Sequence, residues 1–220
     1  MRQEESDPAH RVLPDGCADL LFGRDSGNSG LQVVGPMTRY RDFKLAPEAV
    51  LIGVRFHPGM WSAELKTPGD QITDEMLPLD LLWGARAGEM QRQLEDVDTP
   101  EAAARVLDRN LPETRSLTPA QRAIAAMREQ HGCCSVVELA DQAGLSERQF
   151  RRVCLAETGL SPKFLARVLR FRHAMAQMNA HPCALAHLAL DCGYYDQAHF
   201  INEFRELSGR TPGGRFFQSP

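Results

Sequence analysis

Three arginines share one face of a short predicted helix in the C-terminal half of the chain. Arg148, Arg151 and Arg152 lie at positions i, i+3 and i+4, a spacing that brings side chains together on a helix surface. Arginine can donate two hydrogen bonds at once to O6 and N7 of guanine in the DNA major groove. A solvated basic face is the alternative. We favour base contact, because a helix-turn-helix would place this face in the groove.

A second set of side chains that can read bases lies about fifty residues later. Gln197 and Asn202 can each pair with adenine, and Ile201 can contact a thymine methyl group. Ala198 and His199 lie near the same end of this second predicted helix. The helix is less basic than the first, so we expect it to contribute less to DNA affinity.

The elements that position both sets form an internal repeat. Three residues of the first copy recur 49 positions later: Leu139, Ala140 and Gly144 match Leu188, Ala189 and Gly193. Five more recur 50 positions later: Phe150, Cys154, Gly159, Ser161 and Pro162 match Phe200, Phe204, Gly209, Thr211 and Pro212. The change from 49 to 50 places one extra residue in the turn of the second copy.

Each copy has the pattern of a helix-turn-helix. In the first, Gly144 ends a helix over Val136–Ala143, in the left-handed conformation that glycine adopts at low cost. Ser146 and Gln149 then form the capping-box pattern that begins the next helix. In the second copy, Asp196 is the predicted cap of the helix that carries Asn202.

A long helix over Pro162–Asn179 is predicted to join the two copies, with Ser161 as its cap. Basic residues on this helix and on the second reading helix are candidate phosphate contacts. These candidates are Lys163, Arg167, Arg170 and Arg205. Solubility of the surface explains the three on the long helix equally well.

Charge is distributed unequally along the chain of 220 residues, whose net charge is −4. Residues 1–115 carry 13 Lys and Arg against 20 Asp and Glu, whereas residues 116–220 carry 12 against 9. Only the second half is therefore expected to meet phosphate. No apolar run is long enough to cross a membrane and no signal peptide is visible, so we expect a cytoplasmic protein without membrane contact.

Two stretches of sequence together resemble the DNA-binding domain of the AraC/XylS family. They are ELADQAGLSERQFRRVCLAETGLSPKFLARVLRFRHAM and DCGYYDQAHFINEFRELSGRTPGGRF, within Ser116–Phe217. The resemblance implies two recognition helices in successive major grooves and control of transcription, often as an activator acting through RNA polymerase. It places base contacts at seven positions, and the short side chain of Ala198 departs from the family's usual polar residue. These positions are Arg148, Arg151, Arg152, Gln197, Ala198, His199 and Asn202.

The first half of the chain is predicted to be rich in β-strands and then helical. Strand-like runs cover 10–13, 18–22, 32–34 and 50–56, with a turn at Pro14-Asp15-Gly16, and helices follow over 79–83, 85–94 and 100–110. With 111–116 as linker, the domains are 1–110 and 116–220. The fold class is α+β: a small β-rich domain with helices, for which an incomplete cupin-like domain is one candidate, then two helix-turn-helix units.

The segments LPDGCADLLF, VVGPMTR and GVRFHPG resemble an uncharacterised sensor-like domain that precedes the DNA-binding part of some AraC-type regulators. That resemblance covers about His10–Leu94, and relatives have more chain before it, so strands of a ligand cavity could be missing. Asp19 and Arg55 interrupt apolar strands, and we prefer a buried ion pair to a ligand role for them. His10 and His57 lack the spacing of a metal site. Core packing is the preferred role of Trp61 and Trp83.

These observations predict a sequence-specific transcriptional regulator without catalytic activity, metal or cofactor. Its expected partner is double-stranded DNA. Further candidate partners are RNA polymerase, a small-molecule effector and a second copy of the chain. One alternative is an enzyme similar to Ada-type repair proteins, but the cysteines show no zinc-site spacing. The cysteines are expected to be reduced, buried thiols, except Cys133 and Cys134, which lie in a predicted loop where a redox role stays open. Another alternative is a partner-binding protein whose helix-turn-helix no longer reads DNA.

Overall fold

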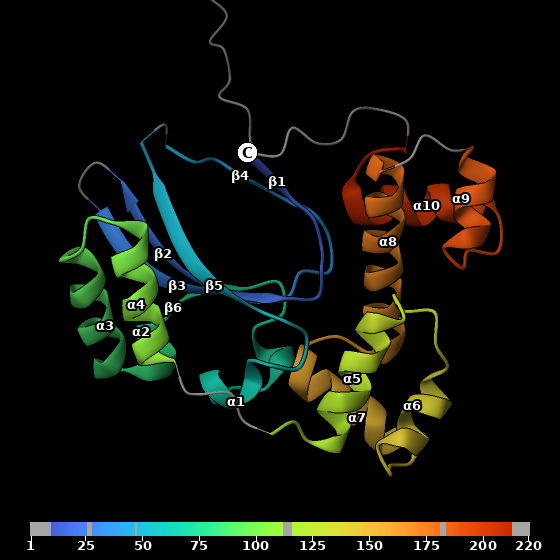
Figure 1. The fold of residues 1–220 in the computed structure, drawn as a ribbon, viewed down its shortest axis with the longest axis horizontal. Helices are drawn as coiled ribbons and strands as arrows, with labels where there is room; N and C mark the ends of the chain where they lie inside the picture. Colours follow the sequence, from blue (N-terminus) through green and yellow to red (C-terminus); the bar gives the residue numbers. More distant parts are fainter. Residues whose placement is uncertain (1–9, 26–27, 47, 112–115, 181–183, 213–220) are drawn as a thin grey trace, which may run out of the picture.

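The computed structural model describes residues 10–25, 28–46, 48–111, 116–180 and 184–212. Its first half contains strands and short helices, and its second half contains helices alone (Figure 1). This is the expected α+β class. The middle of the predicted linker, residues 112–115, and Cys183 lie outside the described residues.

A four-stranded antiparallel sheet forms the centre of the first half. Its order is β5 (Val50–Phe56), β2 (Ala18–Asp25), β3 (Asn28–Val34) and β6 (Met76–Pro78). Buried and partly exposed side chains alternate along β2, as expected for a strand with only one face in a core. The buried face carries Ala18, Leu20 and Phe22, and the other face carries Asp19 and Leu21.

Helices cover the apolar face of this sheet. They are α1 (Ser62–Leu65), the short 3₁₀ helix η1 (Gly69–Gln71), α2 (Asp80–Trp83), α3 (Ala85–Glu95) and α4 (Pro100–Asn110). Figure 1 shows α3 and α4 beside the strands, away from the C-terminal helices. Trp61 is fully buried in the resulting core, and the partly buried Trp83 packs against this core. The preferred core role of both tryptophans agrees with this placement.

Two further strands form a separate ribbon. The strands β1 (His10–Val12) and β4 (Arg41–Phe43) pair antiparallel, with Arg11 opposite Asp42. The predicted turn at Pro14–Gly16 exists, since Gly16 has φ +77° and the amide of Cys17 donates to Asp15 Oδ1 over 2.9 Å. That turn leads from the ribbon into the four-stranded sheet. In the described part of the chain the strands make two separate sheets, and no closed barrel is formed.

Six helices make up the second half. They are α5 (Pro119–Glu129), α6 (Val136–Gln142), α7 (Glu147–Thr158), α8 (Pro162–Ala180), α9 (Leu185–Asp191) and α10 (Gln197–Ser208). The long helix α8 separates two hydrophobic clusters, one with α5–α7 and one with α9 and α10. Figure 1 shows the two units near opposite ends of α8. The predicted helices of both copies are therefore present, within one or two residues of the expected bounds.

Candidate nucleic-acid interface

The first unit holds α7 against α6 through a tight turn. Gly144 has φ +66°, and the amide of Leu145 donates to the carbonyl oxygen of Ala140 over 2.9 Å. At the start of α7, Ser146 Oγ accepts from the amide of Gln149 over 3.3 Å. The amide of Ser146 donates to Gln149 Oε1 over 2.9 Å, which completes the predicted capping box.

The outer face of α7 carries the three predicted arginines. Phe150 and Cys154 are fully buried on the inner face, so Arg148, Arg151 and Arg152 are turned outward and exposed. Arg151 forms an ion pair with Glu147 one turn earlier, and both side chains are well exposed. Such a pair adds little stability in water. The guanidinium group can therefore exchange this carboxylate for an acceptor on DNA.

The second unit repeats this geometry with one more residue in its turn. Gly193 has φ +77°, and the amide of Tyr194 donates to the carbonyl oxygen of Ala189 over 2.9 Å. The additional residue is Tyr195, which is 86% exposed. Asp196 Oδ1 accepts from the amide of His199 over 2.7 Å and caps α10, as expected.

The four predicted base-reading residues of α10 are all exposed. They are Gln197, Ala198, His199 and Asn202. His199 does not extend freely, because its ring lies edge-on to Tyr194 at 5.3 Å between centroids. Its Nδ1 accepts a hydrogen bond from the amide of Tyr195 over 3.4 Å. Its Nε2 faces the carboxylate of Glu203, whose Oε2 lies 4.0 Å away.

The four candidate phosphate contacts fall into two groups. Lys163 and Arg205 are exposed. Arg167 instead binds two carboxylates of α10, with Nε 2.7 Å from Glu203 Oε2 and Nη2 2.7 Å from a carboxylate oxygen of Glu206. Phosphate contact by Arg167 would compete with both ion pairs.

Arg170 belongs with Arg167, since it connects the two units. Its Nη2 donates to the carbonyl oxygen of Gly132 over 3.3 Å, and its guanidinium carbon lies 5.5 Å from the ring centroid of Tyr194. This half-buried side chain thus bridges the loop before α6 and the turn before α10. Phosphate contact by any of the four residues stays a prediction.

Glu203 is a residue of this interface that sequence reasoning missed. Its side chain is only 3% exposed, and Arg167 is its ion-pair partner. It lies on the inner face of α10 between Phe200, Phe204 and Leu207, which are fully buried. A carboxylate inside an apolar helical stripe was the signal available in the sequence, because a buried charge requires a partner.

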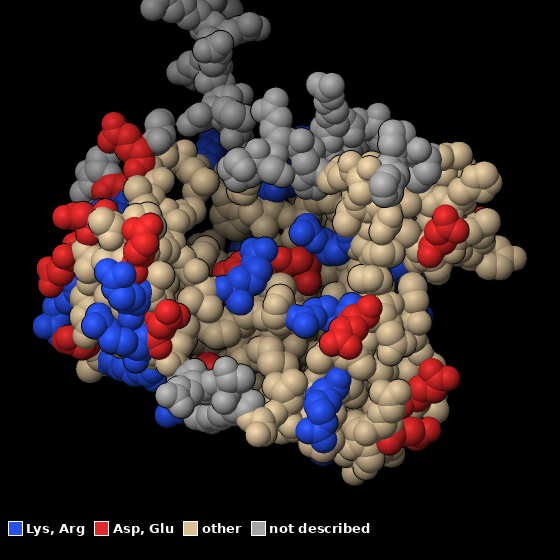
Figure 2. All heavy atoms as spheres, viewed as in Figure 1, with Lys and Arg blue, Asp and Glu red and all other residues tan. Residues whose placement is uncertain are grey.

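Basic side chains do not form a single-sign surface on the face shown in Figure 2. Lys and Arg lie among Asp and Glu both over α3 and α4 and over the C-terminal helices. This face therefore shows no large basic patch among the described residues.

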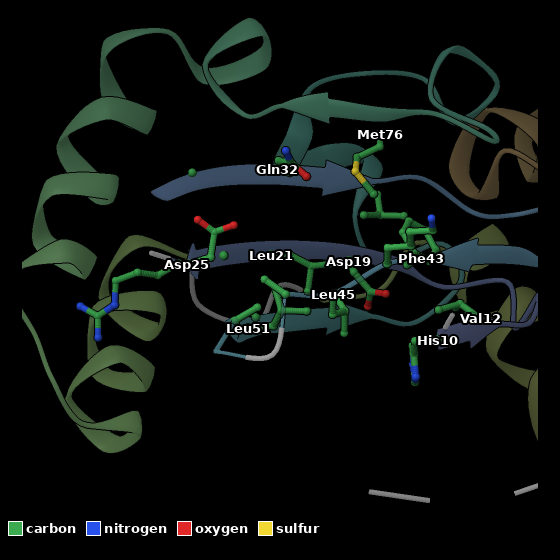
Figure 3. Close-up of a pocket in the computed structure, with 18 of the residues that line it drawn as sticks. His10, Val12, Asp19, Leu21, Asp25, Gln32, Phe43, Leu45, Leu51 and Met76 are labelled. Atoms are coloured by element: carbon green, nitrogen blue, oxygen red, sulfur yellow. The ribbon is translucent and has the colours of Figure 1, made fainter. Parts of the chain in front are cut away.

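A pocket lies on the exposed face of the sheet, where Asp19 and Leu21 of β2 and Leu51 of β5 point into it (Figure 3). Its volume is about 660 Å³, and Phe43 and Met76 add to its largely apolar lining. Arg55 also lines it, with Nε 2.8 Å from Asp19 Oδ1 and Nη1 3.1 Å from an oxygen of Asp15.

The predicted pair between Asp19 and Arg55 is formed, but it is not buried. Arg55 is 53% exposed and Asp19 is 18% exposed. The reason is that odd-numbered residues of β2 face the pocket, while the even-numbered ones face the core. The expected buried ion pair is therefore corrected to an ion pair on a pocket wall, and the choice between a structural and a ligand role stays a prediction.

The cysteines and histidines show no metal site in the described part of the chain, where no three His, Cys, Asp or Glu residues lie close enough to hold an ion. Cys154 and Cys192 are buried, and burial raises the pKa of Cys154 to about 12. Cys133, one of the two loop cysteines excepted from the expected buried thiols, is exposed. No helix among the described residues is both long and apolar enough to cross a membrane.

Comparisons with known proteins match the two halves separately. A family model described as a helix-turn-helix domain matches residues 139–215, and one described as a domain of unknown function, DUF6597, matches residues 1–78. The transcriptional activators RhaR of Salmonella typhimurium strain LT2 and Salmonella enteritidis are 27% identical over 144 residues. Residues 139–215 thus match a helix-turn-helix domain, and these relatives are named transcriptional activators. The match to RhaR covers 65% of this chain and 46% of each activator, so the chain spans about half their length.

Two solved structures are also similar in part. The DNA-binding domain of AdpA, in complex with a target DNA, is 25% identical, with a TM-score of 0.41 over 44% of this chain and 87% of that one. ToxT of Vibrio cholerae is 10% identical, with a TM-score of 0.48 over 94% of this chain and 93% of that one.

Proposed function

We propose that this chain is a regulator of the AraC/XylS type, which binds double-stranded DNA in a sequence-specific manner and regulates transcription. The observation that carries the proposal is the pair of helices α7 and α10, each buried along one face and exposed along the face that bears the predicted reading residues. Helix-turn-helix units insert this part of the second helix into the major groove. One chain thus offers two such helices to successive grooves.

The reading residues of the two helices suit different bases. Arg148, Arg151 and Arg152 are proposed to contact guanines, and Gln197 and Asn202 adenines. His199 is proposed to contact a base edge, for which its Nε2 would turn away from Glu203 Oε2, now 4.0 Å distant. Ala198 has no polar group, so we assign it only close approach to a base. Lys163 and Arg205 are the exposed candidates for phosphate contact.

The direction of regulation is proposed from the relatives. RhaR is named a transcriptional activator, and we propose activation for this chain too, with RNA polymerase as the protein partner. The domains are proposed to be residues 1–110 and 116–220, the second of which reads DNA. Dimerisation through the first domain remains part of this proposal.

A small-molecule effector is proposed for the pocket of the first domain. Its volume of about 660 Å³ lies within the usual range for ligand sites, and its lining is mostly apolar with one charged cluster at Arg55. We expect a mainly apolar molecule with a polar group near Arg55. A thermal-shift screen of such compounds would find it, with Leu21→Asp, which places a charge on the pocket floor, as the variant that loses the shift.

The direct test of DNA reading is selection of bound duplexes from a random library by the full chain, followed by affinity measurements at several salt concentrations. We expect two conserved half-sites separated by about one helical turn. Binding that shows no sequence preference at any salt concentration would contradict the proposal and favour a partner-binding protein.

A further inference from the structure

The first half of the chain contacts both recognition helices at equivalent points. Each helix ends at a glycine with φ +72°, Gly159 after α7 and Gly209 after α10, and these glycines are 50 positions apart in the repeat. The residue before each has a buried hydroxyl that bonds back to the helix: Thr158 to Cys154 and Ser208 to Phe204. The two helix ends are thus built alike, and each is covered by residues of the first half.

The contact at the end of α7 is a close approach of backbones. A Cβ on Gly69 would lie 2.1 Å from the nitrogen of Gly159, so only glycine fits at position 69. Thr73 Oγ1 lies 2.8 Å from the carbonyl oxygen of Gly159 and 3.0 Å from that of Gly69. Ser62 Oγ adds a hydrogen bond of 2.5 Å to Glu157 Oε2. The end of α7 is therefore held at several points.

The contact at the end of α10 is made by a stacked pair of side chains. The ring of Tyr40 fills the space beside Gly209, where a Cβ would lie 2.3 Å from Cε1. The guanidinium carbon of Arg11 lies 4.1 Å from the centre of that ring. Arg11 Nη1 donates to the carbonyl oxygen of Ser208 over 3.2 Å, and Asp42 holds Arg11 in place through two hydrogen bonds.

Asp74 connects these two contacts. It follows Thr73 directly and has φ +61°, an unusual conformation for a residue other than glycine. Its carboxylate accepts from the amide of Thr38 over 2.7 Å and from the hydroxyl of Thr38 over 2.5 Å. Its carbonyl oxygen accepts from Arg41 Nη2 over 2.5 Å. Segments 36–42 and 69–74 thus form one unit, which we call the brace.

We propose that the brace fixes the separation of the two recognition helices, so that Asp74, Tyr40 and Thr73 are positioning residues that determine which half-site spacing is bound. This inference rests on the proposed DNA binding. The links between the two units include α8, Arg170 and the contact of Cys133 Sγ with the carbonyl oxygen of Cys192. The brace adds a link at the C-terminal ends of α7 and α10. The reading residues lie toward the opposite ends of these helices, so a small rotation about the C-terminal end would displace them most.

Because of the geometry of DNA, the separation of the two reading helices determines which half-site spacing the protein prefers. One added base pair moves the second half-site by about 3.4 Å along the axis and about 35° around it. A protein whose two reading helices cannot move must then twist the DNA or lose contacts. A protein with a loosened brace can follow the shifted site.

The test compares the full chain with Asp74→Gly, which removes the carboxylate without straining the positive φ. The probes are duplexes that carry the selected half-sites at the preferred spacing and with one base pair added or removed. We expect the unaltered chain to lose about tenfold in affinity for each change and Asp74→Gly to lose about threefold or less. Base preferences within each half-site should not change. Tyr40→Ala is expected to flatten the spacing profile in the same way.

Two controls separate the brace from charge and from local damage. Asp74→Asn keeps an acceptor for Thr38 and tolerates positive φ, so it should restore most of the spacing dependence. Glu75→Gln removes the same charge from an exposed neighbour and should leave the profile unchanged. Hydrogen exchange without DNA gives a second readout, with faster exchange expected at 155–160 and 205–210 in Asp74→Gly and not in the two control variants.

The outcomes are distinct. Selective binding with the same spacing profile in Asp74→Gly and Tyr40→Ala would overturn this inference and leave the proposed function intact. Exchange that changes only within 36–42 and 69–75 would also overturn it. Equal binding of every duplex by the unaltered chain would overturn the proposed function, and this inference with it.

Discussion

Arg151 illustrates how a residue proposed to read DNA can be oriented in the absence of DNA. Its ion pair with Glu147 spans one turn of α7 on the exposed face, where such pairs contribute about 0.3–0.5 kcal/mol. That energy is smaller than the free energy that a bidentate hydrogen bond to guanine can contribute. Glu147 thus restricts the arginine rotamers at little cost to DNA binding.

Replacing Arg151 by alanine is predicted to weaken specific DNA binding by about 1–3 kcal/mol and to relax base preference at one position. Fluorescence anisotropy with the selected duplex and a random duplex would measure both effects. Arg92→Ala is the matched control, because Arg92 is an exposed arginine paired with Glu89 on α3. An equal loss on both duplexes would show that Arg151 contacts phosphate.

His173 predicts a dependence of stability on pH. Burial lowers its pKa, and so does His131, whose ring is stacked on it at 3.9 Å. The folded protein therefore favours neutral His173, while the unfolded chain binds a proton at about pH 6.5. Stability should be full above that pH and should decline as the pH falls towards the lowered folded value.

Urea unfolding at pH 7.5 and pH 5.5 would measure this decline, which should be smaller in His173→Gln. Burial also lowers the pKa of His57, so part of the pH dependence should persist in that variant. Exposed His187 serves as the control. If His187→Gln reduced the decline as much as His173→Gln, the stacked pair would not be its source.

At the scale of elements, the capping box of α7 is the feature most directly tied to reading. Ser146→Ala removes the acceptor for the amide of Gln149 and should lower the free energy of unfolding by about 1 kcal/mol. The loosened first turn carries Arg148, so DNA affinity should fall as well. Chemical denaturation and anisotropy would measure the two losses. Ser146→Asn keeps a cap and should recover both, and a failure to do so would rule out capping as the cause.

The sequence predicted the helices better than the strands, for a physical reason. Glycines, capping residues and apolar spacing act within a few residues, and they located α6 to α10 and their turns. The strands β4 (Arg41–Phe43) and β6 (Met76–Pro78) have only three residues each, too few to show alternation. The predicted strands at 18–22 and 32–34 are also too short, because β2 continues to Asp25 and β3 already begins at Asn28.

The pairing of Asp19 with Arg55 could be inferred because both interrupt apolar strands. Their exposure could not, since it depends on which face of the sheet the helices cover. The partner of Glu203 and the contacts of the brace could not be inferred from the sequence either. Each depends on contacts between segments far apart in sequence, such as Asp74 with Thr38, for which no local pattern exists.

For the whole molecule, the contact between Gly69 and Gly159 predicts a large effect from one methyl group. Gly69→Ala would place Cβ against backbone atoms of α7 and should destabilise the protein by about 1–3 kcal/mol. Gly88→Ala is the matched control, because no atom lies within 4 Å of its Cβ and alanine favours helix α3. Thermal unfolding of both variants would measure the difference. Equal melting temperatures would show that the two halves separate easily at this contact.

The extra residue in the second turn determines how base-reading residues can be transferred between the two helix-turn-helix units. Because Tyr195 is added before the cap, α7 and α10 match when they are counted from Ser146 and Asp196, so Arg151 corresponds to Ile201 and Arg152 to Asn202. A graft made at the distance that relates the two glycines of the turns, 49 positions, would rotate every transplanted side chain by about 100° around the helix. Anyone who redesigns the bases read by one unit with residues from the other must therefore align the helices by their first turns.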